Sequence, residues 1–514
     1  MSFLSNLYLK LSSSRSFIIY PLILIIFLVA IHAWFCDDSF FTLRPALNFH
    51  YSYGPVWNPG ERVQSFTNPL WMFILSFSDA RNIFNFAFLV SLFLVIGQLL
   101  LIINISRNFF TAVLLFLLSS SSTFIDFGTS GLETPLSGFL VALSYYFARN
   151  IKLNSRLRIV SIIAGLSYLS RPDLLIINFL DPNLRIILDN QLEIKRRFNR
   201  ILIFVSNTMF ILSLWFIFST LYYGFPFPVT AYAKLGIDIS RFSIVYKGIG
   251  FFTSFLISDL SAVTILITAL VIPIKRFLDI SNKIKNLYLL RVPIIILLNI
   301  SYTIFIGGDF FLGRFYYPLL IYGTLSLVEF EENKVNLSFK KYSIIIFSIV
   351  ILISPFYNGQ ISKLWLISKV SKSLNYPLTP FYYHTDKRNS DKEKRDNFCT
   401  LGACDQKNAL LHRFTFSQNR ELNEISRKVS NEYKSTNEIN LSSMQILGSG
   451  YSGYSHGPKY LAYDDQGLTD LLQARMPYIK GTKWYAAHFI KFFPRANDLR
   501  YFLTNDDNFI KIYN

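Results

Sequence analysis

Residues 84–104 read FNFAFLVSLFLVIGQLLLIIN, an apolar run without a single charged side chain. A helix needs about 20 mostly apolar residues to cross the hydrocarbon core of a bilayer. This run has that length, so it predicts a membrane-spanning helix. The organisation of the rest of the chain follows from how often such runs recur and from the charges between them.

Similar runs recur along the first 357 residues, and each is expected to form one span. The first run follows Lys10 and Arg15 and resembles a signal peptide, but it is long and no A-x-A cleavage site follows, so we expect an uncleaved span. Together these apolar runs predict a polytopic α-helical membrane protein with about 11 transmembrane helices. The expected spans are 17–35, 84–104, 109–122, 135–148, 158–170, 173–184, 201–221, 249–273, 287–306, 316–329 and 342–357.

The charges between the spans predict the orientation. Every second loop is basic, as expected for loops on the cytoplasmic side. This places the N-terminus in the cytoplasm and the loop 36–82 outside. The basic residues are Arg107, then Arg149, Lys152, Arg156 and Arg158, then Lys195, Arg196, Arg197 and Arg200, then Lys275, Arg276, Lys283 and Lys285, and last Lys334, Lys340 and Lys341.

The composition excludes several classes of protein. Hydrophobic residues make up 52% of the 514 residues and charged residues 16%, whereas soluble domains carry about 25% charged residues. The composition therefore excludes an ordinary cytosolic enzyme, and an aromatic content of 17% excludes a disordered chain. The net charge of +18 is divided among short blocks between apolar runs, which argues against nucleic-acid binding.

The chain is expected to have two domains, a transmembrane domain over 1–357 and a polar tail over 358–514. The tail is rich in Gly, Asn, Ser and Tyr and is long enough for an independent α/β soluble domain, which the orientation places outside the membrane. Cys399 and Cys404 lie in this tail. They are compatible with a disulfide in an oxidising compartment and equally with two free thiols.

Two adjacent carboxylates, Asp37 and Asp38, follow the first span directly. Like charges at short range raise the pKa of one partner, which suits a general base that removes a proton from a sugar hydroxyl. The alternative is a solvated helix end without chemical function. Gly and Pro predict turns rather than helix in the following segment, 53–71.

The motifs resemble those of the GT-C membrane glycosyltransferases. Within that group they look most like the terminal β-1,2-arabinofuranosyltransferases of the actinobacterial cell wall and their relatives in other bacteria. The matching segments run in order along nearly the whole chain. They are Asp37-Asp38, GPVWNPGERV at 54–63, TNPLW at 67–71, SGLETP at 130–135, SRPD at 170–173, YAK at 232–234, GGD at 307–309, RF at 314–315, DDQGLTD at 464–470 and ARMP at 474–477.

The resemblance implies an inverting transferase on the outer face of a bacterial inner membrane. Its donor would be a sugar, such as arabinofuranose or another pentofuranose, on a polyprenyl phosphate. Its acceptor would be a cell-envelope glycan or glycolipid. Asp37 or Asp38 would be the general base, and the resemblance favours Asp37.

Cations that fall outside the membrane are candidates for binding the leaving lipid phosphate, because arginine binds two phosphate oxygens at once. The candidates for binding the donor or the substrate are Arg44, Asn58, Glu61, Arg62, Asn68, Glu133, Arg171, Asp173, Lys234, Asp309 and Arg314. For three of the arginines an ion pair is the competing interpretation. These pairs are Arg171 with Asp173, Arg314 with Asp309 and Arg62 with Glu61.

Glu133 and Asp309 lie in Gly-flanked loops and are expected to orient the acceptor or hold a cation. No tight carboxylate cluster with a readable coordination spacing is present, so a divalent cation is compatible with the sequence but no cofactor is required by it. In the tail, Asp465, Arg475 and His488 are candidates for binding the acceptor. The tail departs from the family around Ala487-His488 and Phe493-Pro494-Arg495, which leaves the sugar and the acceptor open.

Two other functions compete with the transferase. A carrier or flippase would move a lipid-linked sugar without chemistry and would place ionisable residues near the middle of its spans. Most of the expected spans have none there, and the acidic residues gather in outside loops. A non-catalytic subunit that assembles envelope enzymes is the third interpretation.

Overall fold

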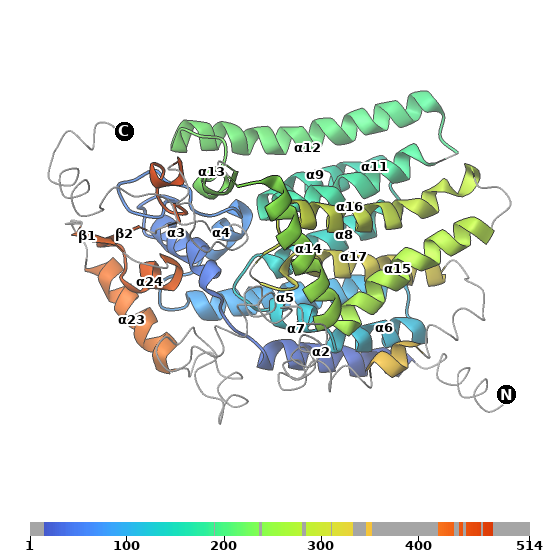
Figure 1. Cartoon of the computed structure of the whole chain (residues 1–514), viewed down its shortest axis with the longest axis horizontal. Helices are drawn as coiled ribbons and strands as arrows, with labels where there is room; N and C mark the ends of the chain where they lie inside the picture. Colours follow the sequence, from blue (N-terminus) through green and yellow to red (C-terminus); the bar gives the residue numbers. More distant parts are fainter. Residues whose placement is uncertain are drawn as a thin grey trace.

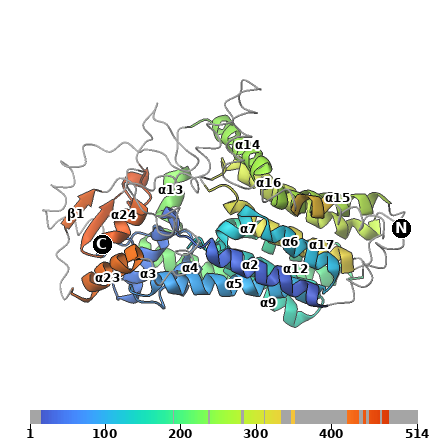
Figure 2. The ribbon, with the colours of Figure 1, turned by 90° about the horizontal axis from the view of Figure 1, so that it is seen from below.

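The computed structural model describes residues 15–189, 191–235, 239–279, 284–309, 311–332, 346–351, 420–435, 442–445, 449–463 and 466–475. Most of the described residues are helical, and most of the long helices run side by side along the long axis of the molecule (Figure 1). The short helices of the first loop and the described parts of the tail lie together at one end of this bundle (Figure 2).

The α-helices are α2 Ile19–Ile31, α3 Phe40–His50, α4 Pro69–Leu75, α5 Ile83–Ile105, α6 Phe109–Ser119, α7 Ser122–Phe127, α8 Thr134–Ala148, α9 Asn154–Ser170, α10 Leu175–Asn178, α11 Leu180–Ile187, α12 Ile194–Tyr223, α13 Val229–Leu235, α14 Arg241–Ser258, α15 Leu260–Asp279, α16 Arg291–Phe305, α17 Tyr317–Glu332, α23 Arg420–Lys434 and α24 Ser449–Ser455. Residues 346–351 are also helical. The 3-10 helices are η1 Arg15–Ile18, η2 Asp37–Ser39, η3 Pro172–Leu174, η4 Ile284–Leu290, η5 Arg314–Tyr316 and η7 Gln473–Arg475. The strands β1 Ser442–Gln445 and β2 Tyr460–Tyr463 pair in parallel, with Ser442 opposite Tyr460.

Four helical segments of the described chain are long and apolar enough to cross a membrane. They are Ile83–Ile105, Ile194–Tyr223, Leu260–Asp279 and Asn286–Phe305. The helices Ile19–Ile31 and Phe109–Ser119 are apolar but shorter. The chain is therefore consistent with a helical membrane protein. The predicted total of 11 spans is not confirmed, and of the expected span 342–357 only 346–351 is described.

Two of the expected spans are wrong as continuous helices. The run 173–184 is divided into η3, α10 and α11. Pro182 lies near the start of α11 and has no N–H to donate to the carbonyl four residues earlier, so the helix cannot run through from α10. The run 249–273 is divided between α14 and α15, which end and begin on either side of Asp259.

Asp259 explains this second break, because its buried carboxylate accepts hydrogen bonds from two segments. Within its own segment it accepts from the backbone N–H of Ala262, at 3.0 Å. From the start of α7 it accepts from the hydroxyls of Ser121 at 2.8 Å and Ser122 at 3.2 Å and from the N–H of Thr123 at 2.7 Å. The residue therefore caps α15 and ties it to α7.

We expect Asp259→Ala to lower the free energy of unfolding by about 2 kcal/mol or more, because it leaves several buried donors without an acceptor. Thermal unfolding of the purified full chain in detergent measures the effect. Asp279→Ala, which removes an exposed carboxylate at the end of the same helix, is the matched control. Equal melting temperatures for the two variants would contradict the role of Asp259.

The described part of the tail packs on the first loop. Arg44 of α3 is buried, and its guanidinium donates to the backbone carbonyls of Gly453 and Tyr460, the latter at 2.7 Å. The indole N–H of Trp57 donates to the carbonyl of Ala462 at 2.7 Å. These contacts fix α24 and β2 against α3. The first loop and the described part of the tail thus pack together at the end of the bundle.

Candidate functional site

Arg314 lies at the centre of a charged cluster that joins three segments far apart in the sequence. One guanidinium nitrogen is 3.1 Å from a carboxylate oxygen of Asp38, and the other is 3.2 Å from Glu133. Asp309, in the loop before Arg314, is 3.5 Å away. We name the residues Asp38, Glu133, Arg171, Asp173, Asp309 and Arg314 the Arg314 cluster.

The backbone before Arg314 explains how the side chain reaches its partners. Gly313 has a φ of 96°, a conformation that favours glycine. A side chain there would also meet Thr123, whose Oγ1 lies 2.5 Å from the position of a Cβ. The turn at Gly313 therefore starts η5 so that Arg314 faces α7, η2 and the loop before α8.

Arg171 forms the second half of the cluster. It follows α9 in an extended conformation, and its guanidinium donates two hydrogen bonds of 3.0 Å to Asp173. It also lies 3.6 Å from Glu133, and its cation stacks on the ring of Phe315 at 4.4 Å. Arg171 and Arg314 thus approach Glu133 together, and the ion pairs of Arg171 with Asp173 and Arg314 with Asp309 are both present.

Glu133 is the most buried acid of the cluster, with a side chain only 2% exposed. Burial by itself would raise its pKa, but the guanidinium groups of Arg314 and Arg171 outweigh burial, so the pKa of Glu133 lies below its usual value. Asn68 donates to its second oxygen at 2.7 Å, and Thr42 in turn donates to Asn68 at 2.9 Å. Glu133 is therefore held ionised and in one orientation.

Asp37 contacts the described part of the tail. Its carboxylate accepts a hydrogen bond of 2.8 Å from the backbone N–H of Tyr451 in α24. The chain passes very close at this point, since a Cβ on Gly450 would lie 2.6 Å from the Asp37 carboxylate oxygen. Asp37 and Asp38 are adjacent in η2, but their side chains contact different segments. Asp37 contacts α24 of the tail, and Asp38 contacts Arg314 of the bundle.

Gly450→Ala is therefore expected to displace Asp37 and to lower the rate of any reaction that Asp37 supports by about 10- to 100-fold. The reason is steric, because the added methyl group collides with both the carboxylate and the carbonyl oxygen of Asp37. Activity measured alongside the melting temperature separates misplacement from unfolding. Gly323→Ala is the control, since its nearest contact is the end of the Leu266 side chain at 3.3 Å. Equal activity in the two variants would show that Asp37 needs no fixed position.

Lys234 of α13 lies near the same acids. Its ammonium group interacts with the charges of Asp38 and Asp309, while burial lowers its pKa.

The other predicted residues lie away from the cluster. Arg44 and Asn58 bind backbone groups of β2, and Asn58 donates to Glu61 at 2.8 Å. Arg62 stacks on the ring of Tyr222 in α12. Arg475 stacks on Phe225 and Tyr232. Asp465 and His488 lie outside the described residues, as do Cys399 and Cys404.

Sequence reasoning missed a second charged cluster at the far end of the bundle. Asp181, Arg185, Arg291 and Glu329 form a buried network there, with Arg291 2.6 Å from Glu329 and 3.2 Å from Asp181. The sequence contained a sign of this cluster, because its four charged residues lie in or beside expected spans, where charged residues are rare. Within the described ranges, no group of three or more His, Cys, Asp or Glu is arranged to hold a metal ion.

The chain is similar to one known transferase over part of its length. A protein named terminal beta-(1->2)-arabinofuranosyltransferase, from Mycobacterium tuberculosis, is 27% identical to it over 224 residues. The match covers 39% of this chain and 35% of the mycobacterial protein, so the chain spans about a third of that relative. No family model matches the chain, and no solved structure matches it. The likeness supports a glycosyltransferase at this coarse level.

Proposed function

We propose that the protein is a membrane glycosyltransferase of the GT-C type that transfers a sugar from a polyprenyl phosphate to a cell-envelope glycan or glycolipid. The sugar is a pentofuranose such as arabinofuranose. The reaction takes place on the outer face of the bacterial inner membrane, with the N-terminus in the cytoplasm and the tail outside. The likeness to an arabinofuranosyltransferase supports the class of reaction. The contacts of the Arg314 cluster support these residues as the location of the active site.

The observation that carries the proposal is the contact of Arg314 with both Asp38 and Glu133. It brings together three of the motifs that resemble the family, although 276 and 181 positions separate Arg314 from these two acids. Arg171 adds a fourth motif through its contact with Glu133. Charges from four distant segments at one buried place are typical of a site rather than of a solvated surface.

In the proposed mechanism, Asp37 is the general base. The carboxylate of Asp38 is paired with the guanidinium of Arg314 at 3.1 Å. The carboxylate of Asp37 accepts a hydrogen bond from the backbone N–H of Tyr451, which orients it. Asp37 takes the proton of the acceptor hydroxyl, the hydroxyl oxygen bonds to the anomeric carbon, and the bond from that carbon to the lipid phosphate oxygen breaks.

The leaving lipid phosphate carries the negative charge that develops in this step. In the proposed scheme Arg314, Arg171 and Lys234 supply the positive charge at this place, and stabilising a developing charge is a large contribution to catalysis. Asp38, Asp309, Asp173 and Glu133 hold the two guanidinium groups in position.

The lipid part of the donor lies against membrane-facing helices. The side of α12 away from the bundle carries exposed apolar residues along its length, among them Phe198, Phe210 and Leu221. The helix ends at Tyr223, shortly before α13 and Lys234. A polyprenyl chain beside α12 would thus bring its phosphate to the end of the bundle at which the Arg314 cluster lies.

The test uses the full chain in lipid nanodiscs with a panel of radiolabelled polyprenyl-phosphate sugars, pentofuranose first, and envelope glycan extract as acceptor. The proposal predicts transfer of label from at least one donor to the glycan. If donors bind and cross the bilayer but no label is transferred, the protein is a carrier and the proposed function is wrong.

A further inference from the structure

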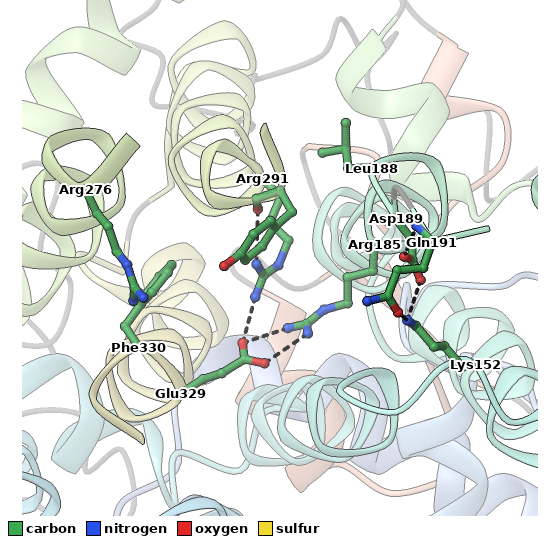
Figure 3. Close-up of a pocket in the computed structure, with 10 residues that line it drawn as sticks. Lys152, Arg185, Leu188, Asp189, Gln191, Arg276, Arg291, Glu329 and Phe330 are labelled. Carbon is green, nitrogen blue, oxygen red and sulfur yellow. Dashed lines mark hydrogen bonds and ion pairs between the residues drawn. The ribbon is translucent and has the colours of Figure 1, made fainter. Parts of the chain in front are cut away.

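A pocket of about 570 Å³ lies at the end of the bundle opposite the Arg314 cluster (Figure 3). Helix α17 connects the Arg314 cluster to the pocket. It begins three residues after Arg314, and Glu329 of the pocket lies in its last turn. At 1.5 Å per residue the helix separates them by about 20 Å. The pocket is therefore distinct from the proposed active site.

The pocket is positively charged. Its walls carry Lys152, Arg185, Arg276 and Arg291 against the two carboxylates of Asp189 and Glu329. Lys152 is paired with Asp189 at 3.1 Å, and with Asp181, which contacts both buried arginines, the group keeps an excess of one positive charge. Figure 3 shows Arg276 and Lys152 at opposite sides, with Glu329 between Arg185 and Arg291. An excess of this kind in a recess attracts an anion.

Two of the cations are fixed in place before any ligand arrives. Arg185 approaches both oxygens of Glu329 at 3.1 Å, and Arg291 approaches the same carboxylate at 2.6 Å. Both arginines also contact Asp181, at 2.7 and 3.2 Å. Their side chains are 11% and 4% exposed, so they are part of the packed bundle and not mobile surface charges. Fixed cations bind an anion with little loss of conformational entropy.

The size and the place of the pocket indicate the ligand. Its volume is within the range of small-molecule sites, about 300–1,000 Å³. Arginine forks match phosphate oxygens. The pocket is built from the ends of α11, α15 and α17, where head groups of the bilayer would lie, and basic pockets between membrane helices bind anionic lipid head groups.

We propose that this pocket binds a phosphate-bearing anion, and that the phosphodiester head group of an anionic membrane lipid is its occupant. The ligand would lie between Arg276 of α15 and Lys152 of the α8–α9 connection, which both line the pocket. The proposal does not depend on the proposed function, because it uses none of the residues of the Arg314 cluster.

The test measures thermal unfolding of the full chain in detergent while dioleoyl phosphatidylglycerol, dioleoyl phosphatidylcholine or inorganic phosphate is added. Arg276→Gln removes a lining cation. Lys275→Gln is the matched control. It also removes one positive charge, one position before Arg276, but the Lys275 side chain is exposed and does not line the pocket. Arg185 and Arg291 are left intact, since they hold Glu329 and Asp181.

Phosphatidylglycerol is expected to raise the melting temperature of wild type and Lys275→Gln saturably, and phosphatidylcholine is not. Arg276→Gln is expected to need about five times more phosphatidylglycerol, because one cation near a lipid head group contributes about 1 kcal/mol. If inorganic phosphate alone stabilises the protein and Arg276→Gln removes this effect, the site is supported with a soluble phosphate as its source.

Equal responses of Arg276→Gln and Lys275→Gln would overturn the proposal, as would a wild-type protein that no phosphate compound stabilises. If Arg276→Gln does not fold, Lys152→Gln replaces it, since the Lys152 side chain is 53% exposed and its loss leaves the packed network intact. A higher phosphatidylglycerol requirement of Lys152→Gln than of Lys275→Gln then supports the proposal, and equal responses of the two variants overturn it.

Discussion

Arg314→Gln is expected to lower the free energy of unfolding by about 3 kcal/mol, because removing one partner of a buried ion pair leaves the other charge uncompensated. Glu133 is the charge left behind, and its side chain is 2% exposed. Burial disfavours the charge of Arg314, but Glu133, Asp309 and Asp38 outweigh burial, so the pKa of Arg314 is raised and its guanidinium stays charged. Arg171 still faces Glu133, which keeps the loss near the lower end of the usual range.

The same variant is expected to lose transferase activity by about 100-fold or more, since a cation that faces the leaving phosphate is removed. Thermal unfolding in detergent and transfer in nanodiscs measure the two effects. Arg81→Gln, which removes an exposed arginine near the end of the first loop, is the control and should resemble wild type. A variant of Arg314 as stable as the Arg81 variant would mean that the cluster is solvated and that its ion pairs contribute little.

Asp37→Asn is expected to lower the rate of transfer by about 10²- to 10⁴-fold, the usual contribution of a general base. The amide keeps the size of the carboxylate and an oxygen that accepts from the N–H of Tyr451, so the tail should stay in place. The melting temperature should therefore change little. Single-turnover transfer at saturating donor measures the loss.

Asp38→Asn separates the two neighbouring acids. It removes the ion pair with Arg314 at 3.1 Å without removing the base, so a smaller loss of rate and a weaker binding of the donor are expected. A loss in Asp38→Asn that exceeds the loss in Asp37→Asn would assign the base to Asp38 and would contradict the proposed division of roles between the two acids.

Much of the fold was predictable because long apolar runs have few alternatives to a membrane helix. The runs 84–104, 201–221 and 287–306 lie in helices long enough to cross. The run 249–273 failed because its break depends on Asp259, whose partners Ser121, Ser122 and Thr123 lie more than 130 positions earlier. The sequence alone does not tell which groups a single polar residue in an apolar run will bind.

The candidate site was predictable as a set of residue types but not as a set of contacts. The loops predict that Glu133, Arg171 and Arg314 lie outside the membrane, and the spacing of Arg171 and Asp173 predicts their short-range pair, which is present. That Glu133 joins both arginines depends on how α8, α9 and η5 pack. The contact of Tyr451 with Asp37 spans 414 positions and comes from a backbone N–H, which any residue except proline could supply.

The most direct test of the proposed transferase is single-turnover transfer of a radiolabelled pentofuranose from its polyprenyl phosphate, compared between wild type, Asp37→Asn and Asp79→Asn in the same nanodiscs. Asp79 lies in the same loop, and its carboxylate accepts hydrogen bonds from Asn82 rather than from the tail. The proposed mechanism predicts transfer by wild type and Asp79→Asn and almost none by Asp37→Asn at a matched melting temperature. Equal transfer by all three, or none by the wild type with any donor of the panel, would contradict it.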